Sequence, residues 1–351
     1  MPIRSGVIAR YAARLPITAE TPRITLFEGE TPLIEAPRLR DQLGLRSVHL
    51  KLEGLNPTGS FKDRGMVVAV ARALQAGSAA LVCASTGNTS ASAAAYGARF
   101  GLRTVVVIPS GRIAMGKLVQ AQVHGAEVLA VDGNFDAALA AVRALAQALP
   151  FTLVNSVNPH RIEGQKTAAF EVLDELGDAP DVVAIPVGNA GNITAYWRGF
   201  REYRAAGLCT RLPRMIGAQA EGAAPLVVGH PIEAPDTVAT AIRIGNPASW
   251  QGAVDARDQS EGAILAVSDD AILEAQRDLA TMEGVFCEPA SAAALAALRR
   301  AVHEGTVAPG ASVVCVLTGN GLKDPAVAVQ RLPPPTTVKA DAASIATALR
   351  L

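Results

Sequence analysis

The chain has 351 residues, half of them hydrophobic and 18% charged, and its 32 Lys and Arg residues balance its 32 Asp and Glu residues. This length predicts about two domains at roughly 150 residues each, and the composition is typical of a soluble globular protein. The charge balance argues against nucleic acid or an anionic membrane as a partner. No stretch approaches the ~20 apolar residues that span a bilayer, so we expect a cytoplasmic protein.

The cysteines and histidines do not have the spacing of metal ligands. Four cysteines (Cys83, Cys209, Cys287 and Cys315) and five histidines are scattered along the chain. We expect the cysteines to be buried and reduced, and we expect no metal site.

Between residues 80 and 330, short β-branched runs alternate with longer Ala-rich runs, which predicts an α/β fold with a mainly parallel sheet. The strands are nearly continuous apolar runs, as expected where helices cover both faces. We expect them at 80–85, 104–109, 127–131, 151–155, 181–187, 214–220 and 312–318. Apolar spacing of three and four predicts helices after Lys62 and at 89–100, 115–124, 135–148, 192–206, 269–282 and 291–303.

No long Gly/Ser linker divides the chain, so its two domains are expected to share an extensive contact. We place a smaller α/β domain at residues 52–150 and a larger one at residues 1–51 and 151–332. A stiff Pro run then leads into a tail at residues 333–351. The end of this tail, DAASIATALRL, predicts a short amphipathic helix that packs on the body or on a partner subunit.

The stretch GLNPTGSFKDRGM, residues 54–66, places Lys62 directly behind a turn-forming run and at the start of a predicted helix. A lone lysine in this position is more often a solvent-exposed charge. The helix dipole, however, disfavours a cation at this end and so favours the neutral amine, which can attack a carbonyl.

Two loops follow a strand and open a helix, where ligands gather in open α/β sheets. Ser85-Thr86-Gly87-Asn88-Thr89 offers hydroxyl, amide and N–H groups to a carboxylate or phosphate, and an ordinary helix N-cap at Thr89 or Ser90 is the alternative. Gly188-Asn189-Ala190-Gly191-Asn192 suits a small phosphate ester better than a dinucleotide. A Gly-rich turn without a ligand is the alternative there.

A third loop, from Gly111 to Leu118, satisfies G-x-x-x-x-G-K, the start of a nucleotide-binding loop. The next position requires Ser or Thr to hold magnesium, and Leu118 stands there, so we do not expect a nucleotide. Lys117 remains a candidate phosphate contact.

A lysine amine, a phosphate cradle and a hydroxyl-rich anion loop together describe a pyridoxal phosphate site. The stretch NPTGSFKD, from Asn56 to Asp63, is similar to the cofactor-lysine motif of the fold type II pyridoxal phosphate enzymes. Within that group the chain resembles the threonine synthase family over nearly its whole length. The matching stretches include EGETPL (28–33), STGNT (85–89), NSVN (155–158), TAIRIGNP (240–247) and TGNGLKD (318–324), of which the last two are the most specific.

This resemblance implies two three-layer α/β/α domains with mainly parallel sheets and the cofactor in the cleft between them. It implies that Lys62 is catalytic, binds pyridoxal phosphate covalently and then moves protons. Asn88 would hydrogen-bond the phenolic oxygen of the cofactor, and Thr318 would face its pyridine nitrogen. The cofactor phosphate would lie on Gly188, Asn189, Ala190, Gly191 and Asn192.

The resemblance also implies a substrate, O-phospho-L-homoserine, and a homodimer. The substrate carboxylate would lie on Ser85, Thr86, Asn88 and Thr89, and its phosphate on Lys117, Ser156 and Arg161, with Asn189 as a further contact. γ-Elimination of phosphate and β-addition of water would yield L-threonine. The alternative is a serine or threonine dehydratase of the same fold, which has no use for Lys117 and Arg161.

Four further charged residues have no assigned part in this chemistry. Glu288 sits where the superfamily often brings a side chain toward the cofactor, and capping of the helix beyond Ser291 explains it equally well. Asp63, Arg64 and Asp324 are expected to be ion-pair partners rather than catalysts.

Overall fold

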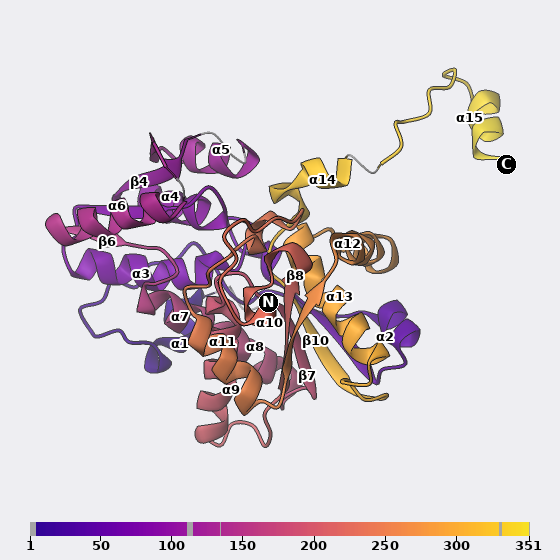
Figure 1. Cartoon of the computed structure of the whole chain (residues 1–351), viewed down its shortest axis with the longest axis horizontal. Helices are drawn as coiled ribbons and strands as arrows, with labels where there is room; N and C mark the ends of the chain where they lie inside the picture. The colour runs from indigo at the N-terminus through magenta and orange to yellow at the C-terminus, as the bar shows by residue number, and fades with distance from the viewer. Residues whose placement is uncertain (1–4, 111–114, 134, 330–331, 351) are drawn as a thin grey trace.

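In the computed structural model, residues 5–110, 115–133, 135–329 and 332–350 are described. Two sheets form the frame, a six-stranded one in the order β1-β2-β10-β7-β8-β9 and a four-stranded one in the order β5-β4-β3-β6. Among the described strands, β1 pairs antiparallel with β2 and the other pairings are parallel. Figure 1 shows the two sheets side by side, each with its own helices.

The larger sheet consists of β1 (Leu33–Glu35), β2 (Ser47–Leu52), β7 (Val182–Pro186), β8 (Arg214–Ala220), β9 (Ala263–Val267) and β10 (Ser312–Leu317). Three helices pack against one face: α2 (Pro37–Leu43), α12 (Asp269–Glu283) and α13 (Pro289–His303). The core of the other face includes residues of α8 (Thr167–Leu176), α9 (Gly191–Ala205) and α11 (Trp250–Gln259).

The smaller sheet consists of β3 (Ala80–Ala84), β4 (Arg103–Pro109), β5 (Glu127–Val131) and β6 (Phe151–Leu153). The helix α6 (Phe135–Ala148) covers one face, and α3 (Lys62–Gln75), α4 (Asn88–Phe100) and α5 (Met115–Val123) belong to the other side. One continuous buried cluster joins α3 and β3 to α8, α9 and β7 of the larger sheet. The two halves therefore share a core.

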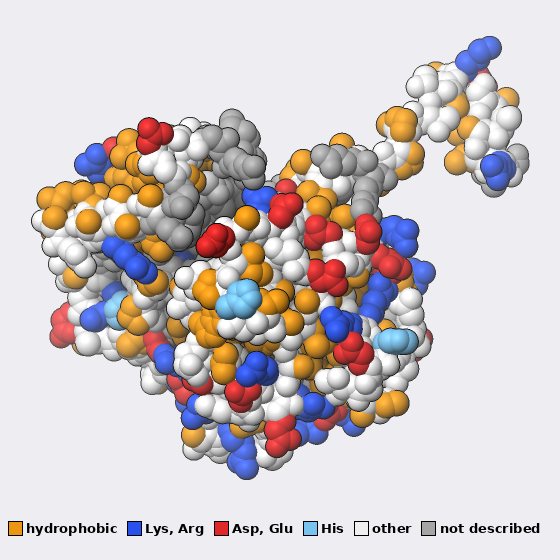
Figure 2. All heavy atoms as spheres, viewed as in Figure 1, with side chains coloured by type: hydrophobic (Ala, Val, Ile, Leu, Met, Phe, Trp, Pro, Cys, Tyr) orange, Lys and Arg blue, Asp and Glu red, His pale blue; other side chains and the backbone are white. Residues whose placement is uncertain are grey.

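The remaining helices are short. They are α1 (Val7–Tyr11), α7 (Pro159–Gln165), α10 (Pro225–Val228), α14 (Pro325–Val329) and α15 (Ala342–Leu349). The last is the helix predicted for the tail, and it begins at Asp341, whose carboxylate accepts a hydrogen bond from the N–H of Ser344 at 2.8 Å. It has no buried residue, and Figures 1 and 2 show it as an arm that stands apart from the body. Within the described part of the chain, the predicted packing on the body is therefore not seen.

All seven predicted strands are present, most of them a residue or two shorter than predicted. Three strands were missed, and β2 shows why. Its polar-looking sequence SVHLKL carries Lys51, a lysine that is fully buried in this fold. The strand β6 (Phe151–Leu153) pairs in parallel with β3 in the smaller sheet.

The cysteines, the apolar helices and the surface charges agree with the expectations from composition. All four cysteines are buried and free. No helix in the described part of the chain is long and apolar enough to cross a membrane. On the face drawn in Figure 2, acidic and basic side chains are interspersed.

A buried network of charges ties the start of α3 to the rest of the molecule. The Arg64 guanidinium, fully buried, donates to both oxygens of Glu53 at 2.7 Å and to both oxygens of Glu171 at 2.6 Å. Lys51 lies 3.0 Å from Glu171 and donates to the carbonyl of Thr31 at 2.6 Å. The network thus joins α3 to β2, α8 and the N-terminal segment, and the prediction of an ion-pairing role for Arg64 is confirmed.

The charge balance within the network sets the protonation of Glu171. Burial by itself raises the pKa of a carboxyl, but the charges of Arg64 and Lys51 outweigh it and lower the pKa of Glu171 to about 2. The carboxylate is therefore ionised throughout the physiological range.

Replacement of Arg64 by Ala would leave two buried carboxylates without their main partner, and we expect it to lower the free energy of unfolding by about 3–5 kcal/mol. Urea unfolding of the purified variant measures this. Arg103→Ala is a matched control, because Arg103 pairs with Glu127 on the surface, where both side chains are at least half exposed, and there we expect at most about 1 kcal/mol. Equal losses in the two variants would contradict the role given to the network.

Candidate functional site

The turn before Lys62 is fastened to the TGNGLKD loop, which follows β10. The N–H of Phe61 donates to the carbonyl of Thr318 at 3.0 Å, and Ser60 forms a bridge with Gly319. Gly59 has a φ of +83°, which glycine adopts without strain. A Cβ at this position would lie 3.2 Å from the Lys323 side chain, so glycine also allows the turn to approach Lys323 closely.

Lys62 is the first residue of α3, as predicted, and it is half-buried. Its Nζ lies 4.1 Å from the centroid of the Phe61 ring. Below it, Asp63 turns inward and accepts hydrogen bonds from Thr58 at 2.7 Å and from Ser92 at 2.6 Å. Burial raises the pKa of this carboxyl, while the hydrogen bonds from Ser92 and Thr58 and the charge of Lys323 act in the opposite direction.

The loop Gly188–Asn192, called the cradle below, leads from β7 into the N-terminus of α9. Ala190 adopts a φ of +64°, which is uncommon for a residue with a side chain. Among the described residues, no hydrogen bond uses the N–H of Gly188, Asn189 or Ala190, and the first N–H groups of α9 have no partner within the helix. These donors lie at the start of a 15-residue helix, which is its positive end.

The cradle is in contact with the segment that contains TAIRIGNP. The carbonyl of Asn189 accepts from the N–H of Ser249 at 3.1 Å, and a Cβ on Gly188 would lie 3.1 Å from the carbonyl oxygen of Ala241. Thr240 in turn donates to Asp324 of TGNGLKD at 2.6 Å. The two stretches that carried the most specific resemblance therefore touch one another beside the cradle.

The loop Ser85–Thr89 connects β3 to α4. Asn155 holds the end of β3 through two hydrogen bonds with the backbone of Ala84, at 2.8 and 2.9 Å. The N-cap position of α4 is Gly87, and no side chain caps it. The alternative of an ordinary cap at Thr89 or Ser90 is therefore wrong, because Ser90 donates to the carbonyl of Gly87 instead of accepting from the helix. The first N–H groups of α4 remain available to an anion.

Asn88 and Thr318 meet the buried residues around the start of α13. The Asn88 amide nitrogen donates to the two Glu288 oxygens at 3.0 and 3.3 Å, and Thr318 shares a 2.9 Å hydrogen bond with Ser291. No hydrogen bond from the described residues reaches Asn88 Oδ1. Glu288 occupies the N-cap position of α13, but its side chain makes no cap hydrogen bond. Capping is therefore not its role.

Arg161 lies in α7 and is almost wholly buried behind the Ser85–Thr89 loop. Its Nη1 donates to the carbonyl of Val154 at 2.9 Å and lies 3.4 Å from Thr89 Oγ1. Its Nε and Nη2 have no hydrogen-bond partner among the described residues. Burial lowers the pKa of Arg161 to about 10, so the guanidinium stays charged at neutral pH. A buried cation with unused donors is suited to an anion that the protein itself does not supply.

The other expected phosphate contacts are only partly placed. Ser156 is half-buried in the turn before α7. Lys117 belongs to α5, but its side chain is outside the described part of the structure, as are residues 111–114 of the same loop. Residue Gln120 of α5 accepts from Lys323 at 2.6 Å, and Lys323 also donates to the carbonyl of Thr58 at 2.7 Å. Sequence reasoning gave no role to this link, and the available signal was the position of Lys323 within TGNGLKD, one of the two most specific stretches.

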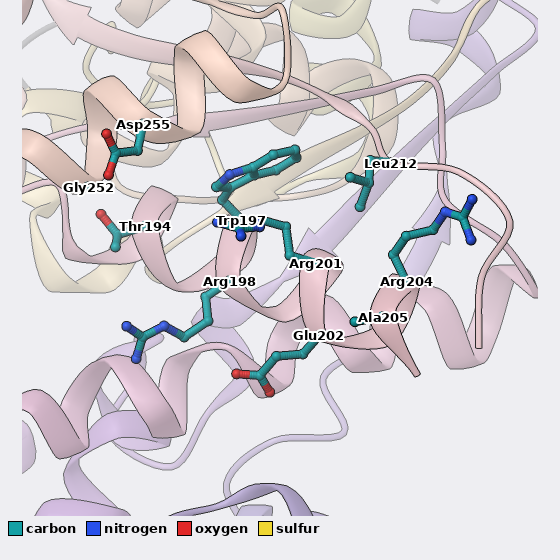
Figure 3. A pocket seen from close by; sticks show the side chains of 10 residues that line it. All are labelled: Thr194, Trp197, Arg198, Arg201, Glu202, Arg204, Ala205, Leu212, Gly252 and Asp255. Atoms are coloured by element: carbon teal, nitrogen blue, oxygen red, sulfur yellow. The ribbon is translucent and has the colours of Figure 1, made fainter. Parts of the chain in front are cut away.

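A separate groove of about 580 Å³ runs along α9 and contains none of the expected site residues. Its side chains come from α9, α11 and the connection that carries Leu212, as Figure 3 shows. Two of its arginines are already engaged, Arg198 with Glu163 and Arg201 with Gln259. We do not place the chemistry there.

The residues that come together fit pyridoxal phosphate. Backbone donors at the start of α9 suit its phosphate, an amide and a hydroxyl suit its ring, and Lys62 supplies an amine. No cluster of His, Cys, Asp or Glu in the described residues has the arrangement of a metal site.

Comparison with known proteins leads to the same class. The family model described as "Pyridoxal-phosphate dependent enzyme" matches residues 24–319. A threonine synthase of Mycobacterium leprae is 59% identical over 99% of this chain and 96% of its own length. A threonine synthase of Halalkalibacterium halodurans is 60% identical over 93% of this chain and 92% of its own. The structure of maize serine racemase, 21% identical over 92% of this chain and 94% of its own, has a TM-score of 0.73 and shows the shared fold. The chain thus belongs to the pyridoxal-phosphate-dependent enzymes, with the fold type II architecture, and within them to the threonine synthase family.

Proposed function

We propose that the protein is a threonine synthase that converts O-phospho-L-homoserine and water to L-threonine and phosphate with bound pyridoxal phosphate. The observation that carries the proposal is Arg161, a buried cation whose Nε and Nη2 have no hydrogen-bond partner among the described residues, and whose Nη1 lies 3.4 Å from Thr89 Oγ1 of the Ser85–Thr89 loop. A site for the cofactor alone has no need of it. A substrate with a second anionic group does.

The cofactor would be held by both halves of the molecule. Gly188, Asn189, Ala190, Gly191 and Asn192 would bind its phosphate, while Asn88 would donate to its phenolic oxygen and Thr318 would face its pyridine nitrogen. When bound, pyridoxal phosphate withdraws electrons from the substrate Cα and so acidifies the protons on Cα and Cβ. Thr318 would bring a hydroxyl to the pyridine nitrogen. Unlike a carboxylate, a hydroxyl does not supply the negative charge that would keep this nitrogen protonated.

The substrate would be held at its two anionic ends. Its carboxylate would lie on Ser85, Thr86, Asn88 and Thr89, at the positive end of α4. Its phosphate would meet Arg161, Ser156 and Lys117, with Asn189 nearby. Holding both ends places Cα and Cβ at the amine of Lys62, since a substrate fixed at two points has little freedom to turn.

Lys62 would serve as the base and acid of the reaction. Its amine takes the proton from Cα and then one from Cβ while phosphate leaves Cγ, and it returns protons to Cγ and Cα. Water adds at Cβ between these steps. The site must exclude other water molecules, because early release and hydrolysis of the unsaturated amino acid would yield a 2-oxo acid in place of threonine.

The domain division at residues 52–150, the homodimer and the cytoplasmic location are further proposals that rest on the sequence pattern and the family resemblance. A size-exclusion measurement with light scattering tests the homodimer directly.

The proposed reaction is tested by supplying purified protein with O-phospho-L-homoserine and measuring phosphate and threonine. Equal amounts of the two are expected. If the protein instead makes 2-oxobutanoate from threonine and releases no phosphate from the phosphorylated substrate, the dehydratase alternative holds.

Lys62→Ala is expected to abolish the visible absorbance of the bound cofactor and to lower kcat by at least about 10³-fold, because the variant loses both the covalent link and the proton carrier. Absorbance spectra and steady-state assays measure the two effects. Lys339→Ala, an exposed lysine of the tail, is the matched control and should behave as the parent protein. A Lys62→Ala variant that kept its colour and turnover would refute the assignment.

Gly191→Ala probes the cradle, because among the described residues a Cβ there would meet only Ser249 Oγ, at 3.8 Å. We expect the cofactor-free variant to be as stable as the parent or up to about 1 kcal/mol more stable, and pyridoxal phosphate to bind at least tenfold more weakly. Gly188→Ala is the comparison, since its Cβ would crowd the Ala241 carbonyl and should lower the stability of the cofactor-free protein as well. Undiminished cofactor binding by Gly191→Ala would place the phosphate elsewhere.

Arg161→Ala is expected to raise KM for O-phospho-L-homoserine about 10- to 100-fold, as loss of charge-assisted hydrogen bonds to the phosphate predicts. Binding of L-threonine, which lacks the phosphate, should change less than about threefold. Arg161→Lys keeps the positive charge and controls for its burial, and we expect an intermediate KM. Equal losses for both ligands would remove Arg161 from the phosphate site.

A further inference from the structure

Glu288 is a buried carboxylate in the candidate site to which the proposed reaction gives no part. It precedes α13 without capping it, and both its oxygens instead face the amide nitrogen of Asn88, at 3.0 and 3.3 Å. Asn88 belongs to α4 beside the smaller sheet, and Glu288 belongs to the larger half of the molecule. This contact therefore crosses the cleft.

The backbone fixes the place of this carboxylate. The N–H of Glu288 donates to the carbonyl of Gly319 at 3.1 Å, and a Cβ on Gly319 would lie only 2.3 Å from Glu288 Oε1. Gly319 is also the bridge partner of Ser60, which lies two residues before Lys62. Glu288 is thus packed against the loop that supports the lysine turn, and only glycine at 319 leaves room for it there.

The contact decides which way the Asn88 amide points. An amide group has two N–H donors on nitrogen and an acceptor oxygen, and it can be turned over at little cost unless a partner distinguishes its ends. A carboxylate accepts from nitrogen and repels the oxygen. Both contacts with Glu288 are made by the amide nitrogen of Asn88, while Asn88 Oδ1 has no hydrogen bond from the described residues.

We propose that Glu288 is a positioning residue that acts through Asn88, holding its amide with the N–H side toward the phenolic oxygen of pyridoxal phosphate. The inference rests on the proposed function, because it takes Asn88 as the partner of that oxygen. Without Glu288, the amide can present its own oxygen to the phenolic oxygen, and two acceptors then face each other.

The test is the affinity of the cofactor-free protein for pyridoxal phosphate, followed by the visible absorbance of the complex. Glu288→Ala should weaken binding about tenfold, the order of one hydrogen bond. Glu288→Gln retains an oxygen that can accept from Asn88, and we expect it to bind within about threefold of the parent. Equally weak binding by both variants would overturn the proposal, because acceptance from Asn88 would then not be what matters.

A double-mutant cycle separates positioning from general loss of structure. In an Asn88→Ala background, Glu288→Ala should cause no further loss of affinity, since the residue through which it acts is absent. An unchanged tenfold loss in that background would contradict the proposal. Ser268→Ala is the structural control, because Ser268 caps α12 by accepting from Ala271 at 3.2 Å, and it should lower Tm without changing cofactor affinity.

The outcomes also distinguish this inference from the proposed function. Parent protein that never develops visible absorbance with pyridoxal phosphate would refute the proposed function. Parent protein that binds the cofactor, with Glu288→Ala binding it equally well, would refute only the role of Glu288.

Discussion

The Arg64 guanidinium, buried between the carboxylates of Glu53 and Glu171, is the interaction on which the site depends. Arg64 lies two residues after Lys62, so whatever fixes Arg64 also fixes the first turn of α3. Removing such charges from water is costly, and the pairing compensates only when the geometry is close to ideal. The network therefore stabilises one arrangement of β2, α3 and α8, and it does so at the first turn of the helix that Lys62 begins.

The loops around the cleft are held mainly by contacts with residues that are not expected to bind the cofactor or the substrate. Asn155 secures the end of β3, Ser249 secures the carbonyl of Asn189, and Lys323 links α5 to the turn before Lys62. Within the described part of the chain, N–H groups at the helix starts of these loops have no hydrogen-bond partner, and neither do Nε and Nη2 of the buried Arg161. Groups that a fold positions firmly but does not satisfy are the expected features of a preorganised anion site.

Much of this arrangement followed from the sequence, because buried parallel strands and the helices between them leave clear periodic patterns. Lys62 at the first position of α3 and the loop–helix starts at Gly188 and Ser85 were predicted from those patterns. The burial of Lys51 and Arg64 was harder to foresee, since charged residues look like surface residues until their partners, distant in sequence, are known. Glu288 illustrates the same limit. The sequence left a position near the cofactor and a helix cap equally open for it, and only the fold shows the carboxylate turned toward Asn88.

The most direct test of the account follows the oxygen of water through the reaction. With O-phospho-L-homoserine in water enriched in ¹⁸O, mass spectrometry of both products shows where the label enters. The account predicts one ¹⁸O in the hydroxyl of threonine and none in the released phosphate, because phosphate leaves by cleavage of the Cγ–O bond and water adds at Cβ. Label in the phosphate, with homoserine as the other product, would show hydrolysis of the phosphate ester and would contradict the account.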